Sequence, residues 1–169
     1  MRALVVVGLL AVLALVVMVV ALVRDTQGEA GIVGGCPEGA PLADVTLRET
    51  KDVKINVYNA TDEPGLASKV ADDFRNRKFQ VKKEGNAGKQ VDDVAILRYG
   101  PKGVGSAHLL RAYFLNNAKD GYDPKRKDDV VDVVLGGSFA QLATTTEVNQ
   151  SLGDLGAPVA PPGSCPSAG

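Results

Sequence analysis

The sequence contains few of the residues on which catalysis and metal binding most often depend. Its 169 residues include one histidine, two cysteines and no tryptophan, and only 5% of them are aromatic. One histidine and two distant cysteines cannot supply the ligand spacing of a known zinc site. No nucleophile motif surrounds His108, and neither glycine-rich phosphate loop, GxGxxG or GxxxxGKS/T, is present. The composition therefore favours a protein that is not an enzyme and that needs no metal or cofactor.

A long apolar run lies near the N-terminus. Residues 3–23 contain no charged side chain, and at about 1.5 Å per residue a helix of this length roughly matches the hydrocarbon thickness of a bilayer. A cleavable signal peptide is the alternative, but its apolar region spans roughly 7–15 residues and ends at small residues. This run ends instead at Arg24 and Asp25. We therefore expect residues 1–24 to be an uncleaved single-pass anchor in the cell membrane. The slight positive excess before the run favours a cytoplasmic N-terminus and an extracytoplasmic domain.

The two cysteines lie on either side of the central part of the chain. Cys36 stands in GGCPEG and Cys165 in GSCPSA. This placement predicts a disulfide that joins the entry of the domain to its exit, which requires an oxidising compartment. The chain-entropy model credits a loop of this length with a little under about 5 kcal/mol, as an upper estimate. Two unpaired, exposed thiols are the alternative.

A change of period marks the start of the folded domain. Ile55 and Val57 alternate with polar residues, whereas Leu66, Val70 and Phe74 recur every four residues, which is typical of a strand followed by a helix. The whole pattern predicts the order βαββαβ, with two right-handed crossovers. The expected fold is a two-layer α+β sandwich, a four-stranded sheet with both helices on one face. The expected strands are Val53–Tyr58, Phe79–Lys82, Val94–Tyr99 and Val130–Leu135, the second helix is Val104–Asn116, and Asn116–Asp128 is expected to be a polar loop.

Composition sets the expected domain boundaries. Residues 25–52 are rich in glycine, proline, alanine and acidic residues, which predicts an extracytoplasmic linker. The folded domain is expected over residues 53–150. Residues 151–169 are mostly glycine, alanine, proline and serine, and we expect them to form a flexible tail.

Charge is distributed unevenly along the chain. Residues 75–127 carry 13 basic and 5 acidic residues, whereas the segments on either side are net acidic. A solvated surface is one interpretation, and a surface that binds an anionic polymer is the other. Outside the membrane no nucleic acid is expected, so a phosphate-bearing wall glycan is the natural candidate. The basic residues predicted to form this site are Arg75, Arg77, Lys78, Lys82, Lys83, Lys125, Arg126 and Lys127.

Three short motifs resemble one known family. They are VYNAT at Val57–Thr61, GLA at Gly65–Ala67 and LGGSF at Leu135–Phe139. Together they resemble the LytR C-terminal domain over about Val53–Phe139. In that family the domain follows the catalytic domain of LytR-CpsA-Psr proteins or stands alone in small membrane-anchored actinobacterial proteins. Two residues depart from the pattern, because Ala60 and Lys78 stand where the family often has glycine.

The resemblance implies a non-catalytic envelope module that works with LytR-CpsA-Psr ligases, which attach glycopolymers to peptidoglycan. No catalytic residue carries over, because the ligase domain is absent from this sequence. The leading hypothesis is a domain that binds such a ligase or a wall glycopolymer and so supports polymer attachment and envelope integrity. The alternative is a module that binds peptidoglycan directly, without a ligase partner. A wall hydrolase is a third class.

Overall fold

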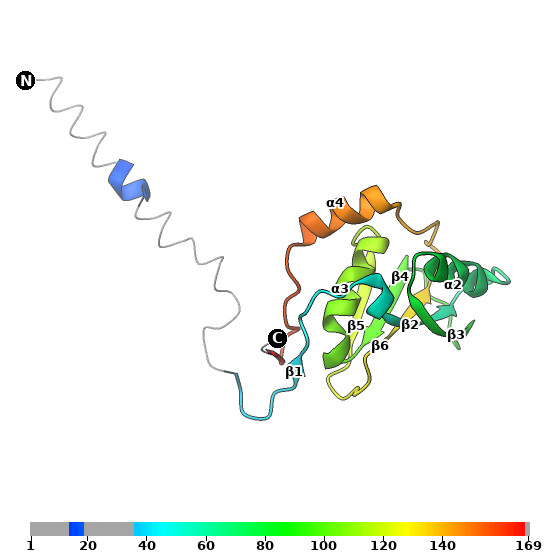
Figure 1. Ribbon diagram of the computed structural model, residues 1–169, viewed down its shortest axis with the longest axis horizontal. Coiled ribbons are helices and arrows are strands. Elements are labelled where there is room, and N and C mark those ends of the chain that lie inside the picture. The colour runs from blue at the N-terminus through cyan, green and yellow to red at the C-terminus, as the bar shows by residue number, and fades with distance from the viewer. Residues whose placement is uncertain (1–13, 19–35, 168–169) are drawn as a thin grey trace, which may run out of the picture. The chain divides into compact units, whose positions relative to one another are not determined.

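The computed structural model describes residues 14–18 and 36–167 (Figure 1). The chain divides into two units, Met1–Cys36 and Pro37–Gly169. In the first unit, residues 14–18 form a helix with exposed side chains, and the remainder of the predicted anchor lies outside the described residues. Among the residues that are described, no helix is both long enough and apolar enough to cross a bilayer.

The second unit is built on a five-stranded sheet with the strand order β3-β2-β6-β4-β5. β4 runs antiparallel to its neighbour β6, and the other neighbouring pairs are parallel. The central strand β6 therefore separates two β-α-β units that run in opposite directions. The strands are β2 at Lys54–Asn59, β3 at Gln80–Asn86, β4 at Ala95–Tyr99, β5 at Ala118–Tyr122 and β6 at Val130–Leu135.

The predicted four-stranded sheet was wrong by one strand, β5. The segment Ala118–Tyr122 reads AKDGY and was predicted to belong to a polar loop, because it has too few apolar residues for a clear alternation. It becomes a strand because it pairs in parallel with β4, which aligns Ala118 with Ala95 and Tyr122 with Tyr99. Tertiary pairing thus overrides a weak local pattern.

Two helices cover one face of the sheet. α2 (Leu66–Asn76) connects β2 to β3, and α3 (Val104–Tyr113), which follows the short 3₁₀ helix η3 (Pro101–Gly103), connects β4 to β5. The ring of Phe74 on α2 lies 6.0 Å, centroid to centroid, from the ring of Tyr113 on α3. The two helices therefore share a face, as the sequence predicted.

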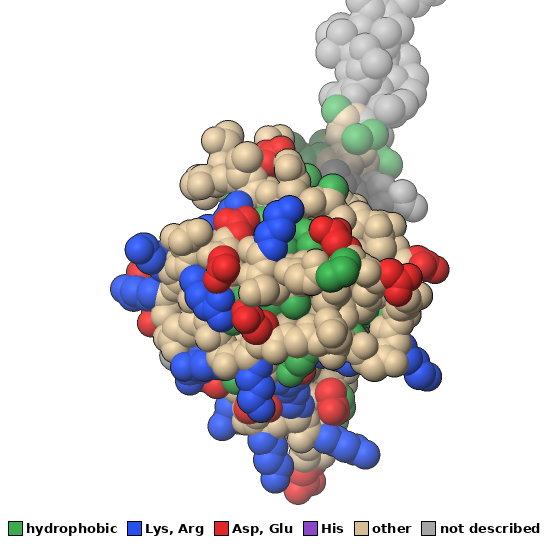
Figure 2. Space-filling model, turned by 90° about the vertical axis from the view of Figure 1, so that its right-hand side faces the viewer, with side chains coloured by type: hydrophobic (Ala, Val, Ile, Leu, Met, Phe, Trp, Pro, Cys, Tyr) green, Lys and Arg blue, Asp and Glu red, His purple; other side chains and the backbone are tan. Residues whose placement is uncertain are grey.

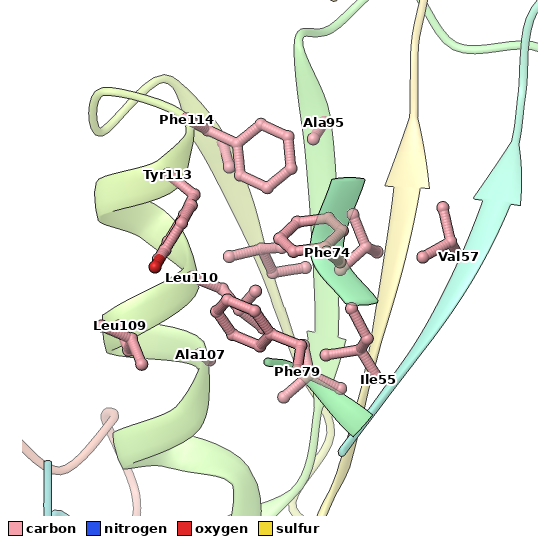
Figure 3. Packing of buried hydrophobic residues seen from close by; sticks show 14 of the residues in the cluster. Ile55, Val57, Phe74, Phe79, Ala95, Ala107, Leu109, Leu110, Tyr113 and Phe114 are labelled. Carbon is pink, nitrogen blue, oxygen red and sulfur yellow. The ribbon is translucent and has the colours of Figure 1, made fainter. Parts of the chain in front are cut away.

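The hydrophobic core lies between this helical layer and the sheet (Figure 3). Ile55 and Val57 point from β2 toward the helices, and Leu110 projects from α3 to meet them; all three are fully buried. Phe74 is also fully buried and makes an edge-to-face contact with Phe79 at 5.1 Å. Aromatic pairs of this kind contribute about 0.5–1.5 kcal/mol beyond the area they bury.

Backbone geometry explains how α2 begins and ends. The N-cap residue is Gly65, at φ 76°, and no side chain caps the helix. At the other end, Lys78 has a φ of 73°. Its N–H donates to the carbonyl of Arg75 and that of Phe79 donates to the carbonyl of Phe74, which is the Schellman arrangement. Lys78 therefore occupies a left-handed position that glycine adopts at less cost.

A third helix and two short strands complete the unit. α4 (Thr145–Leu155) packs on α3, where the Nε2 atom of His108 lies 3.0 Å from the carbonyl oxygen of Gly156. Beyond it, β7 (Cys165–Pro166) pairs in parallel with β1 (Leu42–Ala43). The predicted boundary between residues 150 and 151 falls within α4, and β1 and the 3₁₀ helix η2 (Thr50–Asp52) lie in the segment predicted to be a linker.

The disulfide predicted from the sequence is confirmed. Cys36 and Cys165 are both disulfide-bonded, and they are the only cysteines in the chain, so they are bonded to each other. Next to this bond, the N–H of Cys165 donates to the carbonyl of Pro41, and that of Ser167 donates to the carbonyl of Ala43. The end of the domain is therefore held to its beginning by one covalent bond and a two-residue ladder.

Candidate functional site

The basic residues predicted to bind an anionic polymer lie on three separate parts of the fold. Arg75 is on α2, and Arg77 and Lys78 follow directly after it, on the helical side of the molecule. The Arg75 guanidinium pairs with Asp72 at 2.7 Å and with Glu84 at 3.2 Å, and these carboxylates raise the pKa of Arg75. In the view of Figure 2, acidic side chains stand between the Lys and Arg side chains. The positive charge of Arg75 is therefore compensated by Asp72 and Glu84.

The Arg77 side chain is held in place by contacts with neighbouring residues. Its Nε atom lies 2.8 Å from a carboxylate oxygen of Asp73, and its Nη1 atom donates to the carbonyl of Ala143 at 2.5 Å. Its guanidinium also lies 5.5 Å from the centroid of the Tyr113 ring. Arg77 thus fastens the segment that precedes α4 to the end of α2, and its charge is already engaged.

The other predicted residues lie in β3 and in the loop between β5 and β6. Lys82 and Lys83 are exposed on β3, an edge strand, and Lys125 and Lys127 are exposed in the loop. None of these four lysines makes an ion pair with another described residue. Arg126, which stands between two of them, is half-buried against β6.

The face of the sheet opposite α2 and α3 carries no helix within the described residues, since α4 packs on α3 (Figure 1). We call it the uncovered face. On β2 the residues Ile55, Val57 and Asn59 are buried beneath the helices, so the alternate residues point to the uncovered face. Strand register then places the paired residues of the other strands on the same face. They are Lys54, Asn56 and Tyr58 of β2, Gln80, Lys83 and Gly85 of β3, Ile96 and Arg98 of β4, Lys119 and Gly121 of β5, and Val130, Asp132 and Val134 of β6.

The charged strand residues of the uncovered face are mostly basic, and carboxylates that flank the strands pair with three of the basic groups. Among its described strand residues, four are basic and Asp132 alone is acidic, and the Arg126 side chain adds a fifth basic group because it contacts Asp132. Charge of one sign on a flat surface attracts ligands of the opposite sign. The basic residues of the face are Lys54, Lys83, Arg98, Lys119 and Arg126.

Asp132 holds the centre of the face in place. Its carboxylate accepts hydrogen bonds from Arg126 at 2.8 and 3.3 Å and from the side-chain amide of Asn56 at 2.7 Å. Arg126 also donates to the backbone carbonyl of Arg98 at 3.2 Å. Burial lowers the pKa of Arg126, but hydrogen bonds to Asp132 and Asp128 more than offset this, and its pKa is raised. The guanidinium is therefore charged and fixed in orientation before any ligand arrives.

Two further ion pairs lie at the rim of the face. The Nζ atom of Lys54 is 2.7 Å from Asp129 and holds the pKa of that carboxyl below its usual range. The Nζ atom of Lys119 is 2.7 Å from Asp93. Partly exposed pairs of this kind are screened by salt and exchange partners at little cost. These two lysines can therefore turn toward an anionic ligand.

Sequence reasoning missed three of the five basic residues of the face. Lys54, Arg98 and Lys119 are separated by about 20 residues or more in the chain, and strand register alone brings them together. The signal for Arg98 was present, because it alternates with Leu97 and Tyr99 within a predicted strand. The signal for Lys119 was absent, because its strand was not predicted.

His108 is not part of a metal site in the described part of the chain. There, no group of three or more His, Cys, Asp or Glu side chains stands close enough to hold a metal ion. His108 is buried against α4, and this burial lowers its pKa. Asp72 and Asp128 form ion pairs with Arg75 and Arg126.

The fold and the site together define a two-layer α+β domain that presents a basic, helix-free sheet face. The family model described as LytR cell envelope-related transcriptional attenuator (LytR_C) matches residues 52–139, just over half of the chain. The chain therefore belongs to the LytR_C family, as its motifs predicted. The matched segment contains all five strands of the sheet together with α2 and α3, whereas β1, α4 and β7 lie outside it.

Two mycobacterial proteins are similar to this chain. The cell envelope integrity protein Cei of Mycobacterium tuberculosis is 28% identical over 118 residues, which cover 68% of this chain and 54% of that protein. The chain thus matches about half the length of this relative. The crystal structure of the soluble domain of a conserved hypothetical secreted protein from Mycobacterium marinum is 25% identical, with a TM-score of 0.55. That match covers 69% of this chain and 77% of the other.

Proposed function

We propose that this protein is a cell-envelope binding module, without catalytic activity of its own, whose uncovered face holds an anionic wall glycopolymer. The observation that carries the proposal is the set of five basic side chains on that face, of which Lys83 and Arg98 make no ion pair within the described residues. The envelope role is supported by the family to which the chain belongs and by the name of its relative, a cell envelope integrity protein.

The proposal places the domain outside the cytoplasm. The disulfide between Cys36 and Cys165 supports this location, because structural disulfides persist in oxidising compartments. The similar protein from Mycobacterium marinum is described as secreted. Residues 3–23 are proposed to hold the protein in the cell membrane as a single pass with a cytoplasmic N-terminus.

The proposed role of the module is to support the attachment of wall polymers to peptidoglycan by LytR-CpsA-Psr ligases. The five lysines and arginines of the uncovered face bring the polymer close to the membrane, where such a ligase acts. Co-purification from membranes with the N-terminal segment intact tests this part of the proposal. Co-purification of a ligase with the protein would support this role. If no ligase co-purifies under mild detergent conditions, the proposed partnership with a ligase is contradicted.

Polymer binding is tested with two sets of charge substitutions of equal size. The first set, Lys83→Gln with Arg98→Gln and Lys119→Gln, removes three charges from the uncovered face. The matched control set removes three charges from α2 and its end, through Lys69→Gln, Arg75→Gln and Lys78→Gln. Binding of polygalacturonate and of inorganic polyphosphate to the full-length protein is measured at low and at physiological salt.

The first set is expected to weaken binding of both probes by at least about tenfold at low salt and to flatten the salt dependence. The control set is expected to change binding by less than about threefold, because its charges face the other side of the molecule. The opposite ranking would move the site to the end of α2. A third outcome is that neither set of substitutions nor salt changes binding, and that the protein also binds uncharged glycan strands. This outcome would favour the alternative of a direct peptidoglycan-binding module.

A further inference from the structure

One aromatic side chain stands apart from the others. The chain has four tyrosines and four phenylalanines, and seven of these eight rings contact one another in the core. Within the described residues, Tyr58 alone makes no ring contact, and its hydroxyl makes no hydrogen bond with another described residue. Tyr58 is half-buried on β2, and it points to the uncovered face.

The neighbours of Tyr58 leave its ring accessible. In register with it are Gly85 on one side and Val134 on the other, with Ile96 one strand further on. Gly85 has no side chain to cover the ring, and a Cβ atom built there would lie 3.9 Å from Cδ1 of Tyr58, an ordinary van der Waals contact. Tyr58, Val134 and Ile96 therefore form an apolar row across three adjacent strands, in which Val134 is buried and the other two side chains are partly exposed.

A charged row runs beside this apolar row. Lys83, Asn56, Asp132 and Arg98 are in register across four strands, two residues along from Tyr58, Val134 and Ile96. Strand geometry puts the two rows about 7 Å apart, and adjacent strands lie about 4.8 Å apart. The basic group nearest to Tyr58 along this diagonal is that of Lys83. The spacing is therefore of the order of one sugar residue.

We propose that the uncovered face binds an acidic saccharide, with one sugar ring stacked on Tyr58 and its carboxylate or phosphate directed to Lys83. A sugar ring presents C–H bonds of slight positive charge on one face, and these fit the negative face of an aromatic ring. Its hydroxyls and its acidic group require polar and cationic partners at the edge of that ring, which the charged row supplies. This inference rests on the proposed function and specifies the ligand class of the same face.

The inference separates polymers that contain sugar rings from polymers that carry charge alone. Polygalacturonate has a carboxylate on every sugar ring, whereas inorganic polyphosphate is anionic and has no ring. The variant Tyr58→Leu keeps an apolar side chain on the strand and removes the ring, and Tyr58→Phe removes only the hydroxyl. A third variant, Gly85→Leu, leaves Tyr58 in place and puts a side chain beside its ring, and the backbone at Gly85 does not require glycine.

Binding of both polymers to the full-length protein is compared among these variants, after thermal unfolding confirms that each is folded. Tyr58→Leu and Gly85→Leu are expected to weaken polygalacturonate binding roughly tenfold and to leave polyphosphate binding within about twofold. Tyr58→Phe is expected to bind both polymers as the unsubstituted protein does. Equal weakening of both polymers, or no change for polygalacturonate, would overturn the stacking inference.

A different result would contradict the proposed function. If the unsubstituted protein binds neither polymer, or if loss of Lys83, Arg98 and Lys119 leaves both affinities unchanged, the anionic-polymer function itself is contradicted. If those charges matter for both polymers but Tyr58 matters for neither, the function stands and only the ring contact is lost.

Discussion

The covered and uncovered faces of the sheet come from the same strands but differ in what their side chains do. Beneath α2 and α3, apolar and aromatic side chains such as Ile55 and Phe74 fill the core without exposure. On the other face, Tyr58 is accessible and the charged row is fixed by the hydrogen bonds of Asp132. The comparison indicates that the covered face contributes most of the apolar burial, whereas the uncovered face carries most of its polar and charged groups at partly exposed positions.

The largest expected difference between the faces is in the loss of an aromatic side chain. Phe74→Ala is expected to lower the free energy of unfolding by about 3–5 kcal/mol, because the cavity it leaves is lined by rings that cannot collapse into it. Tyr58→Ala, its matched control on the uncovered face, is expected to cost less than about 1 kcal/mol. Urea denaturation measures both, and equal losses would show that the two faces do not differ in this way.

The disulfide is expected to have the next largest effect. It closes most of the domain into one loop, and β7 is held otherwise by only a two-residue pairing with β1. The double variant Cys36→Ser with Cys165→Ser is expected to be less stable by about 2–4 kcal/mol. A reducing agent should lower the melting temperature of the unsubstituted protein and leave that of the double variant unchanged. If the reducing agent leaves the melting temperature of the unsubstituted protein unchanged, a stabilising role of the disulfide is refuted.

Loss of Asp132 is expected to cost less, because it affects the half-buried part of the uncovered face. Asp132→Ala leaves the Asn56 amide without an acceptor and removes two hydrogen bonds of the Arg126 guanidinium, and about 1–3 kcal/mol is expected to be lost. The control is Asp72→Ala, which breaks the exposed pair with Arg75 and should cost no more than about 0.5 kcal/mol. Similar losses in both variants would mean that the centre of the uncovered face is not preorganised by Asp132.

The smallest expected effect is a gain in stability on the helical side. Lys78 is in the left-handed region at the end of α2, so Lys78→Gly is expected to raise the free energy of unfolding by about 0.5–1 kcal/mol. Lys78→Ala keeps a Cβ atom at the same φ and is expected to change stability little. A destabilised glycine variant would show that the Lys78 side chain contributes contacts that outweigh the backbone strain.

Strong local patterns made most of the central fold predictable. The period of two over Ile55 and Val57 and the period near four over Leu66, Val70 and Phe74 reflect strand and helix geometry directly. The start of α4 also carried a readable signal, because Thr144 and Glu147 form a capping box in which each side chain bonds the backbone N–H of the other residue. That spacing is visible in the sequence but was not used in the prediction.

The candidate site was less predictable because it depends on strand order. Residues 75–127 hold most of the basic residues, yet these residues lie on different sides of the molecule. Arg77 follows α2 on the helical side, whereas Arg98 lies on a strand and points to the uncovered face. No local pattern reveals that β6 lies between β2 and β4, which is what aligns Asp132 with Asn56 and Arg98. Likewise β1 and β7 are two residues long, and they pair although they lie far apart in the sequence.

Lysine labelling compares the two sides of the molecule in a single measurement. The full-length protein is acetylated with acetic anhydride, with and without polygalacturonate, and the modification of each lysine is followed by mass spectrometry. Lys83 and Lys119 on the uncovered face are expected to be protected by the polymer, whereas Lys69 and Lys78 on the helical side are expected to react at unchanged rates. Protection of Lys69 and Lys78 with no protection of Lys83 and Lys119 would contradict binding on the uncovered face.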